Sequence, residues 1–297
     1  MFIFRGGNAS EINEDAAPHA LAPSSHRPEV SHGVEIADVG NGGSEEEDVW
    51  TEDAVDASHC LTHLPKSRKC PICLQAKLYE APHRRRANER AHLRDIRYIE
   101  EPTAPLERIA CDHVISRTSI GIGGETCSLV VVDRFSKLVG VMPCKSKHTD
   151  EVEAVLRRFC GHRSGIVSVA SDRAPEILSA IKRLGFTDDP AEPRSKLHNP
   201  YAESFIRTLT GMTAAILLQA GLSHDYWPLA HKYIEWAYPI TTFWDGGEGG
   251  PLTFYEWHHG YAYEGYKVPF GALVWIKDLN PRPFDPKGEP ALFLGGN

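Results

Sequence analysis

Four side chains that can bind a metal ion lie close together in the segment HCLTHLPKSRKCPIC. His59 and His63 are four positions apart, and Cys70 and Cys73 are three positions apart. Two imidazoles and two thiolates make the Cys2His2 set that suits tetrahedral Zn²⁺, and cysteines separated by two residues can supply two ligands from one tight turn. Because the set contains no carboxylate, we expect a closed, structural zinc site. The alternative is an accidental proximity of unrelated residues.

The other cysteines do not extend this pattern. The chain has seven cysteines, and this odd count, together with the lack of a secretion signal, argues against a disulfide framework. Six residues separate the second histidine from the first cysteine, so the fold around the ion must be tight, and either His83 or His92 could replace one ligand. Four cysteines scattered among apolar residues are interpreted as core or surface thiols: Cys111, Cys127, Cys144 and Cys160.

Three acidic residues occupy positions from which they could form one site. Asp112 follows an apolar run inside an expected strand, Asp172 ends the run IVSVAS, and Glu203 begins a long helical pattern. Clustered carboxylates can hold two divalent ions, which activate an attacking water or hydroxyl and stabilise the leaving oxygen of a phosphodiester. Mg²⁺ prefers such oxygen ligands, and Mn²⁺ suits them equally.

Each of these acids also has an ordinary structural explanation. Asp172 could cap the helix that follows it, and Glu203 could complement a helix dipole. Asp112 is harder to explain in this way, because an unpaired carboxylate inside a strand is costly to bury. Asp133 also lies in an expected strand, where it could pair with Arg134 or cap a turn. The chemical interpretation therefore depends on the three acids acting as a set.

The apolar pattern predicts the elements that would position these residues. Three successive strands are expected between residues 105 and 145, with a hairpin turn at GIGGE. Asp150 and Glu153 predict a capping box for the helix that follows. The remaining elements are a helix at 149–161, a strand at 165–172, a helix at 174–185, a long helix from Asn199 to Gln219, a helix at about 225–243 and two C-terminal strands.

Charge is distributed very unevenly along the 297 residues. Residues 1–56 carry 13 acidic residues and two arginines, whereas residues 57–100 carry ten basic and four acidic residues. An acidic tail followed by a basic segment is common in proteins that meet nucleic acid, although a solvated tail and linker would have the same composition. The basic residues expected to follow DNA phosphates are Lys66, Arg68, Lys69, Arg84, Arg85 and Arg86.

The order of these segments resembles the integrase region of LTR retrotransposon polyproteins, most like the copia type. The His and Cys pairs followed by QAK resemble its zinc domain, and PLERIACDHV resembles the strand with its first catalytic aspartate. The resemblance covers residues from about 58 to 297 and continues through these segments: LVVVDRFSKLVGVMPCKSK, SDRAPEIL, HNPYAESFIRTL, YWPLA and VPFGALVWIKD…FDPKGEPALFLGG.

The resemblance implies an RNase H-like core whose catalytic triad is Asp112, Asp172 and Glu203. It implies processing of the 3′ ends of element DNA and strand transfer into a target, with Mg²⁺ or Mn²⁺ at the triad and Zn²⁺ at the His/Cys set. Arg207 follows Glu203 on one helix face and is expected to reach a DNA phosphate. The chain departs from the family pattern at Ala174, Pro200 and Ser204, and 30 residues separate the second and third acids, fewer than in the family.

The expected fold class is therefore α/β. A mixed five-stranded sheet with flanking helices forms the core, preceded by a disordered acidic tail and a small Cys2His2 zinc domain, and followed by a small β module. The expected divisions are 1–56 for the tail, 57–80 for the zinc domain, 81–104 for a basic linker, 105–262 for the catalytic core and 263–297 for the β module.

The resulting functional hypothesis is an integrase-type polynucleotidyl transferase of a retrotransposon, or its truncated remnant. Its expected partners are double-stranded DNA, both element ends and target, and further copies of the chain. No apolar run approaches the roughly 18 residues of a membrane span, so we expect an intracellular protein, nuclear when it acts on DNA. The alternatives are an inactive nucleic-acid-binding protein derived from such an integrase and an unrelated zinc-stabilised interaction protein.

Overall fold

The structure is a computed structural model that describes several stretches of the chain. These are residues 3–5, 56–77, 102–116, 119–161, 168–189, 199–245, 250–277, 284 and 286–295. The described elements all belong to one compact unit, formed by Met1–Arg5 and Val55–Asn297. Within these stretches, no helix has the length and apolar character needed to cross a membrane.

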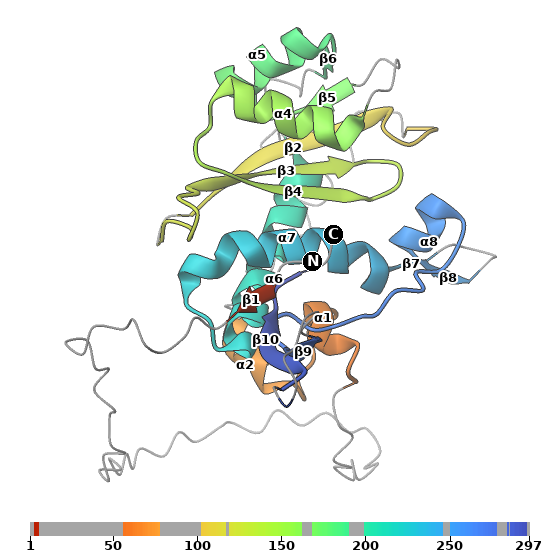
Figure 1. The fold of residues 1–297 in the computed structure, drawn as a ribbon. Helices are drawn as coiled ribbons and strands as arrows, with labels where there is room; N and C mark the ends of the chain where they lie inside the picture. Colours follow the sequence, from red (N-terminus) through yellow and green to blue (C-terminus); the bar gives the residue numbers. More distant parts are fainter. Residues whose placement is uncertain are drawn as a thin grey trace, which may run out of the picture. The chain divides into compact units, whose positions relative to one another are not determined.

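A mixed five-stranded sheet forms the centre of this unit (Figure 1). The first three strands, β2 (Arg108–Ile115), β3 (Cys127–Asp133) and β4 (Val139–Cys144), are consecutive and antiparallel. β5 (Ser168–Ala170) pairs in parallel with β2, and β6 (Thr187–Asp188) pairs in parallel with β5. The sheet order is β4-β3-β2-β5-β6, so the predicted α/β fold class with a mixed five-stranded sheet is confirmed.

Helices cover both faces of this sheet. One hydrophobic cluster joins the sheet to α4 (Thr149–Cys160) and α5 (Pro175–Leu184), and the other joins it to α6 (Pro200–Ala220) and α7 (Trp227–Thr241). The short 3-10 helix η2 (His224–Tyr226) leads into α7. The strand β3, which lies between β4 and β2, is buried at every position, because alternate residues face the two helical layers.

Among the local predictions, the hairpin turn is confirmed and the capping box is wrong. The GIGGE hairpin is present, closed by a 2.8 Å hydrogen bond from the backbone N–H of Gly121 to the carbonyl of Glu125. The predicted capping box of Asp150 and Glu153 is wrong, because His148 is the N-cap residue of α4 and makes no side-chain cap. The stretch after residue 185, for which no strand was predicted from the sequence, contains the two-residue strand β6.

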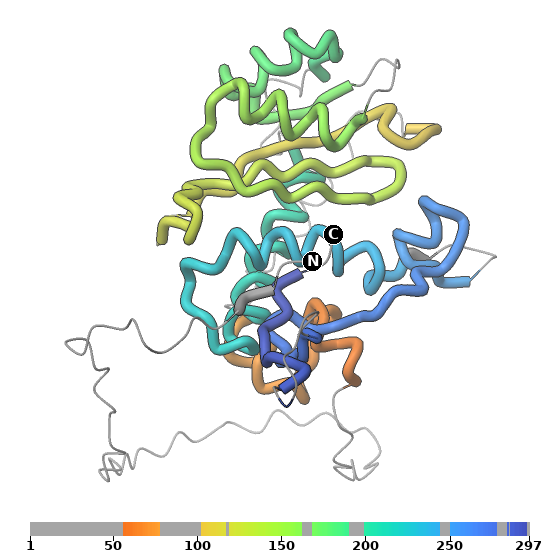
Figure 2. Tube along the Cα trace, in the orientation of Figure 1, coloured from red at the N-terminus to blue at the C-terminus, as the bar shows by residue number. Residues whose placement is uncertain are grey.

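Two short helices near the N-terminus pack onto the second helical layer. α1 (His59–Thr62) contacts both α6 and α7, and α2 (Pro71–Ala76) contacts α6. In Figure 2 the orange trace of residues 56–77 runs beside this layer. The Gln219 amide donates a 3.2 Å hydrogen bond to the carbonyl of Cys60. The predicted zinc domain is thus in direct contact with the core helices.

The C-terminal part adds small β elements to the same unit. β7 (Phe243–Asp245) pairs with β8 (Pro251–Thr253), which leads into α8 (Phe254–His259). The predicted terminal strands are present as β9 (Leu273–Lys277) and β10 (Gly288–Phe293).

The N-terminus supplies a third strand to the C-terminal sheet. β1 (Ile3–Arg5) pairs antiparallel with β10, so the prediction of a tail without structure does not hold for these three residues. The remainder of the predicted tail up to residue 55 lies outside the described residues, and so does most of the predicted basic linker.

Candidate metal centre and carboxylate site

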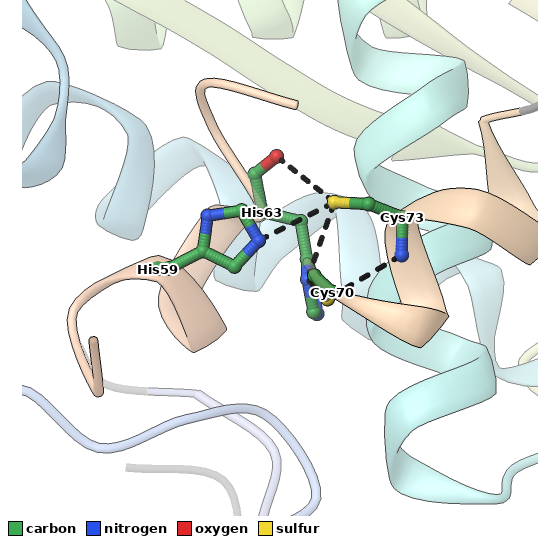
Figure 3. Close-up of side chains that lie close together, drawn as sticks. All are labelled: His59, His63, Cys70 and Cys73. Carbon is green, nitrogen blue, oxygen red and sulfur yellow. Dashed lines mark hydrogen bonds between the residues drawn. The ribbon is translucent and has the colours of Figure 1, made fainter. Parts of the chain in front are cut away.

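The four predicted zinc ligands come together in one buried cluster. The ligand atoms of His59, His63, Cys70 and Cys73 all lie within 4.8 Å of one another. Figure 3 shows the imidazoles and thiols pointing toward a common centre. Among the described residues, this is the one group of three or more His, Cys, Asp or Glu side chains close enough together to hold an ion.

The distances within the cluster match a tetrahedral ion. With Zn–S bonds of about 2.3 Å and Zn–N bonds of about 2.0 Å, a sulfur and a nitrogen on one tetrahedron are about 3.5 Å apart. The Cys70 sulfur lies 3.5 Å from Nδ1 of His63, and the Cys73 sulfur lies 3.3 Å from Nε2 of His59 and 3.8 Å from Nδ1 of His63. The donor set and its spacing therefore fit Zn²⁺.

Local backbone structure explains how the ligands converge. His63 ends α1 in a left-handed conformation, with φ of 54°, which turns the chain away from the helix immediately after the first two ligands. Cys70 is the N-cap residue of α2, and Pro71 follows at the first helical position. The backbone N–H of Cys73 points at the Cys70 sulfur, 3.4 Å away, so the tight turn places both sulfurs on the same side.

Burial sets the protonation of the cluster. It lowers the pKa of His63 to about 4, with a further contribution from His59, and it also lowers the pKa of His59. Both imidazoles are therefore neutral near pH 7, which is the form that binds a metal. Burial raises the pKa of the Cys73 thiol, and a bound cation would reverse this effect.

A buried lysine beside this cluster, which the sequence did not point to, links the two short helices. Lys77 is only 4% exposed, and its ammonium donates a 2.8 Å hydrogen bond to the carbonyl of His63. The neighbouring Cys73 and Cys70 favour the charged form of Lys77, opposing the burial that lowers its pKa. The ammonium thus fastens the end of α2 to the end of α1, around the ligands.

The three predicted catalytic acids come from three different elements. Asp112 lies in β2, Asp172 lies two residues beyond the end of β5, and Glu203 lies in the first turn of α6. β2 and β5 run in parallel, and their last paired residues are Ala110 and Ala170, so each aspartate lies two residues after the last paired residue of its segment. Asp112 and Glu203 are partly buried, and Asp172 is exposed.

These carboxylates affect one another electrostatically. The pKa of Asp112 is raised to about 6, mainly by burial and further by Asp172 and Glu203. The nearby Lys147 acts in the opposite direction and lowers it. Like charges held near one another favour a divalent cation, which would offset their repulsion, and carboxylate oxygens are the donors that Mg²⁺ prefers. The donor chemistry therefore fits Mg²⁺ or Mn²⁺, but in this structure the three carboxylates do not form a group whose ligand atoms lie close enough together to hold an ion.

Asn199 joins the segments that carry the acids. Its side chain is 2% exposed, and its Nδ2 donates hydrogen bonds to the carbonyls of Cys111 at 2.8 Å and Ala170 at 3.4 Å. The backbone carbonyl of Asn199 accepts a 3.0 Å hydrogen bond from the backbone N–H of Glu203. The sequence signal was an asparagine before a helix that starts with proline, which suggests a cap but not this contact.

Asp133 has a structural role. It is fully buried and accepts hydrogen bonds from the backbone N–H groups of Leu106, Phe135 and Ser136, at 3.1 to 3.3 Å, and from the Ser136 hydroxyl at 2.5 Å. It therefore holds the turn between β3 and β4, which is one of the two explanations considered from the sequence.

The predicted DNA-contacting residues are only partly described. Arg207 is exposed on α6, and Arg68 and Lys69 are exposed beside the His/Cys cluster. The Lys66 ammonium donates a 2.5 Å hydrogen bond to the carbonyl of Lys77, so it ties the segment before α2 to the end of that helix. Arg84, Arg85 and Arg86 lie outside the described residues, as do the alternative zinc ligands His83 and His92.

Comparisons with known proteins give matches among solved structures. No family model matches the sequence, and no curated protein matches it. The chain is similar to the catalytic core domain of BIV integrase, with 20% identity and a TM-score of 0.36 over 51% of this chain and 92% of that one.

Two further solved structures are retroviral integrases. One is the simian T-cell lymphotropic virus intasome in complex with the PP2A regulatory subunit B56 gamma, with 16% identity and a TM-score of 0.44 over 65% of this chain and 69% of that one. The other is the HTLV-2 integrase catalytic core domain in complex with magnesium in a trimeric form, with 15% identity and a TM-score of 0.41 over 53% of this chain and 99% of that one.

Proposed function

We propose that this protein is a divalent-metal-dependent polynucleotidyl transferase of the integrase type. The proposal rests on one observation above all: Asp112, Asp172 and Glu203 lie on elements that Asn199 ties together, and they are near enough for the other two acids to raise the pKa of Asp112. Carboxylates whose charges act on one another in this way, once drawn together by divalent ions, suit in-line displacement at a phosphodiester. The resemblance of the segment order to copia-type integrases supports the same reaction.

In this proposal the chain's own residues hold the metal and orient the DNA. Asp112, Asp172 and Glu203 supply oxygen ligands for Mg²⁺ or Mn²⁺. When bound, these ions activate the attacking water or 3′ hydroxyl and stabilise the leaving oxygen. Arg207, exposed one helical turn after Glu203, contacts a phosphate. A zinc ion held by the His/Cys cluster is structural, because all four of its positions are filled by protein ligands.

The substrates in this proposal are double-stranded DNA ends and a DNA target, and the active form is an assembly of several copies of the chain. The test is strand transfer of an oligonucleotide end into plasmid DNA with Mg²⁺ or Mn²⁺. Asp112→Asn should abolish the product while the protein keeps one equivalent of zinc and its thermal stability. Zinc content shows that the variant remains folded, so loss of product reports on the carboxylate alone.

Two results would change this conclusion. Metal-independent DNA binding without any strand transfer would favour the alternative of an inactive nucleic-acid-binding protein derived from an integrase. Strand transfer that survives Asp112→Asn would place the reaction at other residues.

A further inference from the structure

Asn199 occupies the point at which two parallel strands stop pairing. The ladder between β2 and β5 ends at Ala110 and Ala170. The amide of Asn199 then donates to the carbonyls of Cys111 and Ala170, one from each strand. A side chain therefore continues the connection between the two segments, just before the chain reaches Asp112 in one and Asp172 in the other.

The contact acts on all three acids through the backbone. The Cys111 carbonyl belongs to the peptide group that joins Cys111 to Asp112, so a hydrogen bond there restrains the orientation of Asp112 directly. The Ala170 carbonyl lies two residues before Asp172. The backbone carbonyl of Asn199 accepts a hydrogen bond from the backbone N–H of Glu203. One buried residue thus connects the two segments that carry Asp112 and Asp172 to the helix that carries Glu203.

The chemistry of the contact requires a donor. Two carbonyl oxygens face the same Nδ2, and carbonyls can only accept hydrogen bonds. The Asn199 Oδ1 is buried and has no hydrogen-bond partner among the described residues, so the side chain is held by its donor end. Serine is too short to span both strands, and aspartate would present an anionic oxygen to two carbonyl oxygens.

We infer that Asn199 is a positioning residue that sets the spacing of Asp112, Asp172 and Glu203 and so determines the affinity of this site for divalent metal. This inference rests on the proposed function, because it assumes that the three carboxylates share a metal. Groups that orient metal ligands from behind typically change metal affinity by about 10- to 100-fold when they are removed.

The experiment measures Mn²⁺ binding by electron paramagnetic resonance on the full chain loaded with zinc. Asn199→Ser keeps a residue type favoured at a helix start but cannot reach Cys111, and it should weaken Asp112-dependent Mn²⁺ binding about tenfold or more. The matched control is Ser128→Ala, which removes another buried side-chain hydrogen bond, at 2.9 Å to Nδ1 of His231. It should leave the Mn²⁺ affinity unchanged.

A second variant separates positioning from charge and protects against a folding defect in the first. Asn199→Asp keeps the shape of the side chain and adds a negative charge, which by itself would strengthen cation binding. The positioning role predicts weaker Mn²⁺ binding in this variant, because the carboxylate repels both carbonyls. Tighter binding in Asn199→Asp, or equal weakening in Ser128→Ala, would overturn the inference.

The same titration distinguishes failure of the inference from failure of the proposed function. If Asp112→Asn weakens Mn²⁺ binding and Asn199→Ser does not, the carboxylate site stands and Asn199 has no positioning role. If Asp112→Asn binds Mn²⁺ as the wild type does, the carboxylates do not form the metal site, and both conclusions fall.

Discussion

Two strand aspartates that look alike in sequence differ in their surroundings. Asp133 is fully buried and accepts four hydrogen bonds, whereas Asp112 is partly buried, with its charge opposed by burial and by two neighbouring acids. Asp133→Asn should lower the free energy of unfolding by about 2–4 kcal/mol, because it replaces acceptors with a misplaced donor inside the turn. Urea denaturation measures the change.

Asp112→Asn is the matched variant for this comparison. In metal-free protein it should leave the free energy of unfolding unchanged or slightly higher, because it removes a repelled charge. Equal destabilisation by the two substitutions would show that Asp112 is a structural residue and would count against its proposed role at the metal site.

A buried histidine makes stability depend on pH. His231 is 6% exposed, and burial lowers its pKa to about 3 from a usual value of 6.5. Below pH 6.5 the unfolded chain takes up a proton that the folded protein does not bind, so stability falls as the pH falls. The slope reaches about 1.4 kcal/mol per pH unit between roughly pH 6 and pH 4.

The measurement is the free energy of unfolding between pH 4 and pH 7, by urea denaturation. His231→Gln should reduce the slope of the unfolding free energy against pH by up to about 1.4 kcal/mol per pH unit, the contribution of one proton. Glutamine does not titrate and can still form a hydrogen bond with Ser128. The same change at the exposed His148 is the control. An unchanged slope in His231→Gln would mean that this imidazole is protonated in the folded protein.

Among the elements, α1 and α2 depend most on a metal. They have four and six residues, too short to be stable alone, and their cross-connections are the His/Cys cluster and Lys77. Chelation of zinc should therefore speed amide hydrogen exchange throughout residues 58–77. It should also speed exchange near Gln219 of α6, which bonds to Cys60.

Exchange measured by mass spectrometry tests this coupling. The strand β3, buried at every position, is the internal control and should keep its protection when zinc is removed. If exchange rises in residues 58–77 but not near Gln219, the two short helices do not stabilise the core helices. If it rises nowhere, the cluster holds no structural ion.

For the molecule as a whole, charge asymmetry predicts how DNA binding responds to salt. The net charge of the full chain is −8, yet the residues after the acidic N-terminal segment are net basic. Binding should weaken steeply with salt, and each phosphate contact contributes about one unit to the slope of log K against log salt. Arg68→Ala and Lys69→Ala should each reduce that slope by about one unit.

The control for this measurement is an arginine outside the proposed DNA surface. Arg157 pairs with Glu153 at 2.6 Å on α4, so Arg157→Ala should leave the slope unchanged. Fluorescence anisotropy at several salt concentrations gives the slope. A slope near zero for the wild-type protein would exclude a role of the basic residues in contacting phosphates.

The elements and the zinc ligands could be predicted from sequence because their signals are local. Apolar periodicity predicted α6 and β3, since one helix turn or one strand alternation already contains the pattern. The His and Cys pairs are recognisable because each pair lies within a few residues. Capping was predicted less well, since His148 displaced Asp150 as the start of α4, and only the packing of the helix decides where its first turn begins.

The relations between distant residues were decided by the tertiary structure. The hydrogen bond from Asn199 to Cys111 spans 88 positions, and that from Gln219 to Cys60 spans 159, and no local pattern encodes either contact. The pairing of Ile3 with Phe293 likewise needs both ends of the chain in one sheet. Sequence alone determined which residues could do chemistry, because residue type sets charge and donor atoms. The folded sheet and helices decided which of those residues meet, because only packing brings distant backbone groups within hydrogen-bonding range.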